Sequence, residues 1–228
     1  GPPLLRTQKD LRDRLGLPCA GLMPARTRKG KAAETAQDAL ALNRTLAQVR
    51  AEVSRFAAGQ SGRIIAMVPV EAGEVEALPA LVESLASAEE RVLVINAGGL
   101  GQGVAQRLGA LPQVEMWKPA DLHRILPQSR SGRDSAQTAD LRATYRHILL
   151  CLPPLIAPGF PVALASIADG SVLLVPWGRV TPDLLREAVA AQGAALRPVI
   201  TTVLTGANLA QARLYMRRGD YEERVLHA

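Results

Sequence analysis

Short apolar runs alternate along the chain with stretches in which apolar positions recur every three or four residues. The first pattern predicts strands buried on both faces, and the second predicts amphipathic helices. Strands are expected at 63–69, 91–97, 113–117, 145–154, 171–177 and 198–204. Helices are expected between them, at 74–90, 103–111 and 181–193. The last of these has Thr181 as N-cap, Pro182 in its first turn and Gly193 at its end.

Buried strands separated by helices predict a mostly parallel sheet that is covered on both faces, which is a doubly wound α/β fold. In such folds ligands bind outside the carboxyl ends of the strands. The loops that follow residues 69, 96, 152 and 176 are therefore where we expect a binding site.

The N-terminal part of the chain has a different pattern. Residues 5–24 predict a short helix followed by a short strand, and 33–57 predict one long amphipathic helix. We therefore describe one domain with two parts: a basic helical and strand segment, 1–62, that packs on an α/β core, 63–228. Residues 127–140 are polar and rich in Ser and Arg, so we expect an exposed loop there.

Composition narrows the class of protein. Of the 228 residues 48% are hydrophobic, which indicates a globular domain, and only 3% are aromatic. So few rings argue against a base-stacking surface, and we expect no nucleic-acid partner. No apolar run is long enough to span a bilayer. Cys19 and Cys151 lie in apolar runs and are expected to be reduced core thiols, and no metal-ligand spacing is present.

The excess of positive charge is confined to one end of the chain. Residues 1–62 carry eleven Lys/Arg and five Asp/Glu, which accounts for the whole net charge of +6. Such a segment suits an anionic partner, a membrane surface among them, or it forms a solvated linker surface. Both alternatives also hold for the basic run at 26–31.

Four segments in a fixed order resemble the cytoplasmic domain of bacterial tyrosine kinases. They are GLPCAGLMP at 16–24, ALNRTL at 41–46, YRHILLCLPP at 145–154 and DGSVLLVPWGRVT at 169–181. Those domains are P-loop proteins attached to the chain-length regulators of polysaccharide synthesis. The resemblance spans nearly the whole chain and implies a P-loop NTPase-like, MinD/ParA-like three-layer sandwich.

The resemblance places the phosphate-binding loop on Gly73, Glu74, Val75, Glu76 and Ala77. Such a loop needs a second glycine, a lysine for the phosphates and a hydroxyl for Mg²⁺. Val75, Glu76 and Ala77 occupy those three positions. The lysine is thus replaced by a carboxylate, which repels phosphate.

The remaining nucleotide-site positions also depart from the family pattern. The resemblance implies aspartates at Asn96 and Gly98, where the family holds metal and activates the attacking hydroxyl, and a third at Cys151. A thiol is a poor ligand for Mg²⁺, because hard cations prefer oxygen. Thr205 stands where the resemblance implies an asparagine beside adenine. We therefore expect no cofactor and no catalytic residue.

This chain keeps few residues of the family's interface motif and of its phosphoacceptor tyrosine cluster. Its ring-forming helix motif falls on Asp38, Ala41 and Arg44, so a single arginine remains, and a homo-oligomer stays an open expectation. Its tyrosine cluster is reduced to Tyr215 and Tyr221. These two tyrosines could be phosphoacceptor sites. The alternative is that one is packed and the other is exposed on a frayed tail.

The interpretation that follows is a non-catalytic, pseudokinase-like scaffold or regulator of exopolysaccharide or capsule assembly. It implies a place at the cytoplasmic face of the bacterial inner membrane, with the basic segment near the membrane. Its partners would be other proteins of the assembly and export complex. Two alternatives stay open: a divergent, active ATP-dependent tyrosine kinase of the same pathway, and a ParA/MinD-like binding ATPase.

Overall fold

A seven-stranded parallel sheet forms the centre of the computed structural model, in the order β1-β7-β6-β2-β5-β3-β4. The structure describes all residues except 26–35, 60–61, 73–76, 87–90, 127–135 and 227–228. The strands are β1 (Cys19–Pro24), β2 (Arg63–Pro69), β3 (Val92–Asn96), β4 (Val114–Trp117), β5 (His147–Cys151), β6 (Gly170–Pro176) and β7 (Val199–Ala207). The predicted doubly wound parallel sheet is confirmed.

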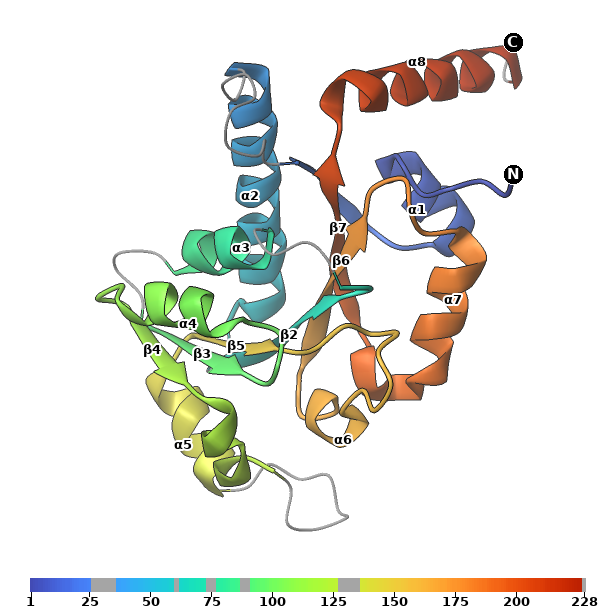
Figure 1. Cartoon of the computed structure of the whole chain (residues 1–228). Coiled ribbons are helices and arrows are strands. Elements are labelled where there is room, and N and C mark those ends of the chain that lie inside the picture. The colour runs from blue at the N-terminus through green and yellow to red at the C-terminus, as the bar shows by residue number, and fades with distance from the viewer. Residues whose placement is uncertain (26–35, 60–61, 73–76, 87–90, 127–135, 227–228) are drawn as a thin grey trace.

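Helices cover both faces of the sheet (Figure 1). Apolar side chains of α2, α3 and α4 form one buried cluster with one face of the sheet, and those of α1, α6 and α7 form another with the opposite face. The helices and 3-10 turns are α1 (Gln8–Leu15), α2 (Ala36–Ala57), α3 (Ala77–Leu85), α4 (Gln102–Gly109), η1 (Pro119–Arg124), α5 (Ala136–Thr144), α6 (Val162–Ala165), α7 (Pro182–Ala191), η2 (Gly193–Leu196) and α8 (Leu209–Leu226). These are the three layers of the predicted sandwich.

The N-terminal residues contribute directly to the sheet. Strand β1 forms its edge by pairing in parallel with β7, where Cys19 lies opposite Thr202. The Leu5 amide donates to the Val180 carbonyl at 2.8 Å, and the Gly178 amide donates to the Leu5 carbonyl at 2.8 Å. Backbone hydrogen bonds therefore hold the start of the chain against the loop that follows β6.

The amino edge of the sheet is tied by one carboxylate. Asp169 Oδ2 accepts from the Ile64 amide at 2.8 Å and pairs with the Arg142 guanidinium, while the Asp169 amide donates to the Ile64 carbonyl at 2.7 Å. Arg142 also donates to the Gly62 carbonyl at 3.2 Å. A Cβ on Gly62 would lie 1.7 Å from the Tyr145 carbonyl oxygen, so only glycine fits there. The contacts join β2, α5 and the start of β6.

One expectation from the sequence was wrong. Residues 136–140, predicted as part of an exposed loop, begin helix α5, and the rest of that stretch, 127–135, lies outside the described residues. Helix α5 is short and polar, and besides Arg142 it is fixed by its buried Thr138 and by Leu141 against the core, too few contacts to produce an apolar stripe.

The C-terminal residues, for which a frayed tail was one alternative, form helix α8, which is anchored by the fully buried Ala212.

Candidate functional site

A cavity of about 270 Å³ opens at the carboxyl edge of the sheet. Pro69 and Pro176, which end β2 and β6, line it together with Gly98 and Pro154 from the loops after β3 and β5. The sequence predicted a site where these four loops meet, and this juxtaposition is confirmed. Glycine, proline and aliphatic side chains form most of the wall, with Glu71 and Thr205 as the polar exceptions among the described residues.

The loop after β3 is held by the side chain of Asn96, which is 7% exposed. Its Oδ1 accepts from the amides of Gly98 at 3.0 Å and Leu100 at 3.2 Å, and its Nδ2 donates to the Leu100 carbonyl at 3.0 Å. Gly98 has a φ of +106°, a conformation that favours glycine. Asn96 therefore acts as a structural brace of this turn, and its amide group is engaged on both sides.

The loops after β3 and β5 lie in close contact. A Cβ on Gly99 would lie 2.4 Å from the Leu152 carbonyl oxygen, so a side chain there would force the loops apart. The segment after β5 then crosses β2: the Leu155 amide donates to the Pro69 carbonyl at 2.8 Å, and the Ile156 amide donates to the Val70 carbonyl at 3.2 Å. One side of the cavity is thus fixed by backbone hydrogen bonds.

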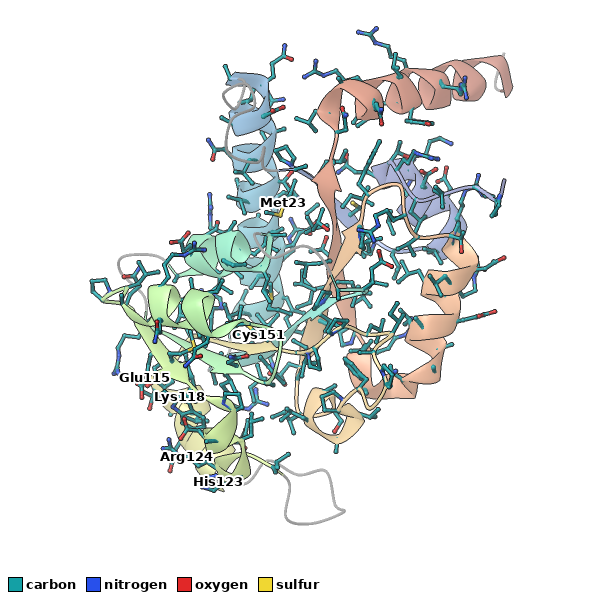
Figure 2. All side chains as sticks on the ribbon, in the orientation of Figure 1. Met23, Glu115, Lys118, His123, Arg124 and Cys151 are labelled. Carbon is teal, nitrogen blue, oxygen red and sulfur yellow. The ribbon has the colours of Figure 1, made fainter. Side chains whose placement is uncertain are left out.

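Cys151 ends β5 next to Asn96 and is fully buried (Figure 2). Burial raises the pKa of its thiol to about 12, because the apolar surroundings disfavour the charged thiolate. The group is therefore a neutral thiol at physiological pH. A neutral thiol packed in the core offers no oxygen ligand to a hard cation.

Glu71 was not singled out by the sequence, yet among the described residues it is the carboxylate that lines this cavity. Its Oε1 lies 3.1 Å from Arg179 Nη2, an ion pair that lacks the alignment of a hydrogen bond. The Glu71 side chain is 20% exposed and that of Arg179 is 65% exposed. The pair joins the loop after β2 to the loop after β6. Only its position directly after a buried strand could have drawn attention to Glu71 in the sequence.

Four of the five residues on which the phosphate loop was predicted, Gly73, Glu74, Val75 and Glu76, lie outside the described residues. The fifth, Ala77, is the first residue of α3 and is buried, with 4% exposure. Its methyl group belongs to the buried cluster that α2, α3 and α4 form with one face of the sheet. At this position the chain offers no side-chain oxygen.

Thr205 lies on β7 at the wall of the cavity and is 2% exposed. Its Oγ1 has no hydrogen-bond partner among the described residues, although it is buried. A buried hydroxyl without a partner is costly, so this atom is a weak point of the site.

The two residues named as a candidate interface lie on α2. Arg44 is exposed and borders a groove of about 550 Å³ between α2, β1 and α8, whereas Asp38 is half-buried one and a half turns earlier. The groove also contacts Cys19, whose burial raises the pKa of its thiol. Whether this face forms an interface stays a prediction.

The candidate acceptor Tyr215 is packed on the surface of the domain. Its ring lies edge-on to that of Trp177, with 6.2 Å between centroids, and the Arg6 guanidinium stands 4.4 Å over it. Trp177 Nε1 in turn donates to the Arg6 carbonyl at 2.9 Å. Tyr221 belongs to α8, and its side chain lies outside the described residues. The packing of Tyr215 favours a structural role for its ring.

No protein-family profile matches the chain, and no curated protein matches it. Solved structures do match it. The BceF tyrosine kinase domain is 16% identical with a TM-score of 0.60, and the match covers 90% of this chain and 99% of that one. The kinase domain of the Escherichia coli tyrosine kinase ETK is 12% identical with a TM-score of 0.62, covering 89% and 95%.

A third match is the chimerical protein CapA2B2, 14% identical with a TM-score of 0.57, which covers 88% of this chain and 99% of that one. This chain has the fold of a bacterial tyrosine kinase domain. The likeness extends over most of both chains, so it includes the N-terminal segment as well as the α/β core.

The described strand ends of this kinase-like fold lack the carboxylates that the resemblance implies for a magnesium nucleotide. The strand ends at which the resemblance implies metal-binding aspartates carry an amide engaged in a turn and a buried thiol. Among the residues that the structure describes, no cluster of three or more His, Cys, Asp or Glu could hold a metal ion. The carboxylate that does face the cavity, Glu71, is paired with Arg179. A phosphate about 4 Å from it would meet repulsion of roughly 4 kcal/mol at an effective dielectric near 20, less what Arg179 offsets.

Proposed function

We propose that this chain is a non-catalytic, pseudokinase-like module that supports exopolysaccharide or capsule assembly through protein contacts. The observation that carries the proposal is the chemistry at the carboxyl edge of the sheet. The side chains at the ends of β3 and β5 serve structure, as a turn brace and a core thiol, in a scaffold of the kinase type. Phosphoryl transfer depends on positioned charge, and these residues supply none.

The cellular place of this module is part of the same proposal. The neighbours in structure are named as tyrosine kinase domains, and the resemblance of the sequence connects such domains with polysaccharide chain-length regulators. Among the described residues, no helix is long and apolar enough to cross a membrane. We place the domain at the cytoplasmic face of the inner membrane, where the basic residues of 1–62 face anionic lipid.

Nucleotide binding tests the proposal directly. Calorimetric titration of the chain with ATP and with ADP, each with Mg²⁺, is expected to give no saturable heat. The BceF tyrosine kinase domain, titrated in the same buffer, serves as the positive control. Micromolar, Mg²⁺-dependent binding by this chain would refute the proposal.

A restoring variant makes the absence of heat informative. The triple change Glu71→Ala, Glu76→Lys and Ala77→Thr removes the carboxylate of the cavity and returns the lysine and hydroxyl of a phosphate loop. Nucleotide binding by this variant alone would locate the loss in the residues named here. If neither the wild type nor the triple variant binds nucleotide, the BceF domain still shows that the assay detects binding.

The second candidate function is an active, divergent tyrosine kinase, which is favoured by the kinase names of the neighbours in structure. It requires transfer of labelled phosphate from ATP to Tyr215 or Tyr221. Incubation with radiolabelled ATP and Mg²⁺, followed by peptide mapping, separates the two functions. Label on either tyrosine that disappears in the Tyr215→Phe/Tyr221→Phe variant would establish the kinase.

A further inference from the structure

Another cavity of about 550 Å³, separate from the groove beside α2, lies between helix α4 and the edge strand β4. We call it the α4–β4 groove. Helix α4 borders this groove and the candidate site with different faces: Val104 lines the candidate site, whereas Gln102, Ala105 and Gln106 line the groove. Its volume lies in the range of about 300–1,000 Å³ that is usual for ligand pockets.

The wall of the groove is one face of α4, since Gln102, Ala105, Gln106 and Gly109 follow helical spacing. The small side chain of Ala105 leaves room for another segment to approach the helix, whereas Gly109 lies directly against Met116, where an added Cβ would be 3.4 Å from Met116 Cβ. Met116 of β4 lies opposite and is half-buried. Its flexible thioether adapts to different apolar side chains, so the floor suits an apolar group.

The rim of the groove carries hydrogen-bond donors that are not engaged. Within the described part of the chain, the side chains of Gln102, Gln106 and Lys118 are exposed and have no hydrogen-bond or ion-pair partner. The backbone of Lys118 is fixed, because its amide donates to Asp121 Oδ2 at 2.9 Å. An ammonium group and two carboxamides are therefore held around an apolar floor.

Positive charge continues from the rim along η1. Arg124 is exposed there, and its guanidinium stands 4.0 Å over the Trp117 ring, a contact that orders it. Cation–π stacking leaves the outward N–H groups of Arg124 able to donate. Lys118 and Arg124 form a cationic ridge at the β4 edge of the molecule (Figure 2).

The nearby acids do not neutralise this ridge. Glu115 is engaged with Tyr145, which donates to it, and with Arg91, whose Nη2 lies 3.5 Å from Glu115 Oε2. Asp121 accepts the backbone amide of Lys118 and keeps its negative charge. The cations Arg91, Lys118 and Arg124 outnumber the carboxylates Glu115 and Asp121 by one, so the ridge keeps a small net positive charge.

We propose that the α4–β4 groove docks an acidic peptide segment of a partner protein. An apolar side chain of the segment lies against Met116, and its carboxylates pair with Lys118 and Arg124. Charge complementarity favours an acidic segment as the occupant, and the oligomeric state tests whether a second copy of this chain supplies it. The inference deepens the proposed function, since a scaffold acts through such contacts.

A peptide array tests the docking surface. Fluorescently labelled chain is applied to an array of short random peptides, beside the variants Ala105→Arg, which fills the groove, and Lys118→Glu, which reverses the charge at its rim. Arg213→Glu on α8 is the matched control, because it makes the same charge reversal at an exposed position on another element. Circular dichroism confirms that each variant is folded.

The expected result is a set of peptides, rich in Asp, Glu and apolar residues, that bind the wild type and the Arg213→Glu control alike. Fluorescence anisotropy of the strongest of them should show at least roughly ten-fold weaker binding to Lys118→Glu. Binding to Ala105→Arg should be lost. Equal binding to all four proteins, a captured set without acidic bias, or no capture by the wild type would overturn the proposal.

The oligomeric state provides the remaining arm. If light scattering shows a wild-type oligomer that Ala105→Arg separates into monomers, the groove is a self-interface and the proposal fails. None of these assays contains nucleotide. Failure of the docking proposal is therefore distinguishable from failure of the non-catalytic function, which the ATP titration decides.

Discussion

At the scale of single residues, the side chains at the strand ends of the candidate site stabilise the local structure. Asn96 and Cys151 face each other across paired strands, and neither is free for chemistry: the amide braces a turn and the thiol is fully buried. Their positions were predicted from the sequence, but their roles follow from contacts that only the fold supplies.

Replacing Asn96 with Ala should lower the free energy of unfolding by about 1–3 kcal/mol, because the Gly98 and Leu100 amides lose their acceptor. Urea denaturation measures the change. Asn96→Asp keeps an acceptor for both amides but loses the donor to the Leu100 carbonyl, so it tests that second hydrogen bond separately. The brace would be disproved if Asn96→Ala unfolded at the same urea concentration as the wild type.

Cys151 predicts a dependence of stability on alkaline pH. Burial raises the pKa of its thiol from 9.0 to about 12. Between these values the unfolded chain loses the proton and the folded chain keeps it. The contribution of the protonated Cys151 to the free energy of unfolding is therefore complete below pH 9.0. Above that pH it falls by up to about 1.4 kcal/mol per pH unit.

Urea unfolding over a series of pH values above 9.0 measures this dependence. Cys151→Ala has no thiol to ionise and should show a shallower decline, although its stability at neutral pH is lower. Parallel declines for the two proteins would mean that the thiol is not the group responsible.

At the scale of elements, α8 shows how a few contacts organise a helix that the sequence left undecided. Ala212 is fully buried, and the Tyr215 ring is held between Arg6 and Trp177. The helix therefore joins the N-terminal residues and the end of β6 through one aromatic side chain.

Tyr215→Ala should release α8 from this contact, because both the ring and the cation–π interaction with Arg6 are lost. Amide hydrogen exchange along 209–226 should become at least several-fold faster, while exchange in the sheet stays unchanged. Tyr215→Phe keeps the ring and should protect the helix nearly as well as the wild type. Equal protection in the Ala variant would count against this anchor.

At the scale of the whole molecule, stability depends on the tie between distant segments at the amino edge of the sheet. Asp169 joins the β2 backbone to Arg142, and both side chains are largely buried, with 20% and 13% exposure. Removing one partner of a buried ion pair leaves the other charge without compensation.

Asp169→Ala should therefore destabilise the whole domain by about 3–5 kcal/mol. Asp13→Ala is the control: it breaks the exposed pairs of Asp13 with Lys9 and Arg12 and should cost far less stability. Calorimetric unfolding compares the two. Similar losses in both variants would contradict a special role for the amino-edge tie.

The sequence by itself determined the α/β class, the parallel sheet and the meeting point of the loops, because buried strands and amphipathic helices leave regular apolar patterns. It also identified Asn96, Gly98 and Cys151 as occupants of the strand ends. The sequence did not predict helices α5 and α8, because each is fixed by a few tertiary contacts and has no strong apolar stripe. The Glu71–Arg179 pair joins residues far apart in the chain, and the α4–β4 groove depends on how α4 packs beside β4. Only the tertiary structure decided these two features, because it sets which loops and elements meet.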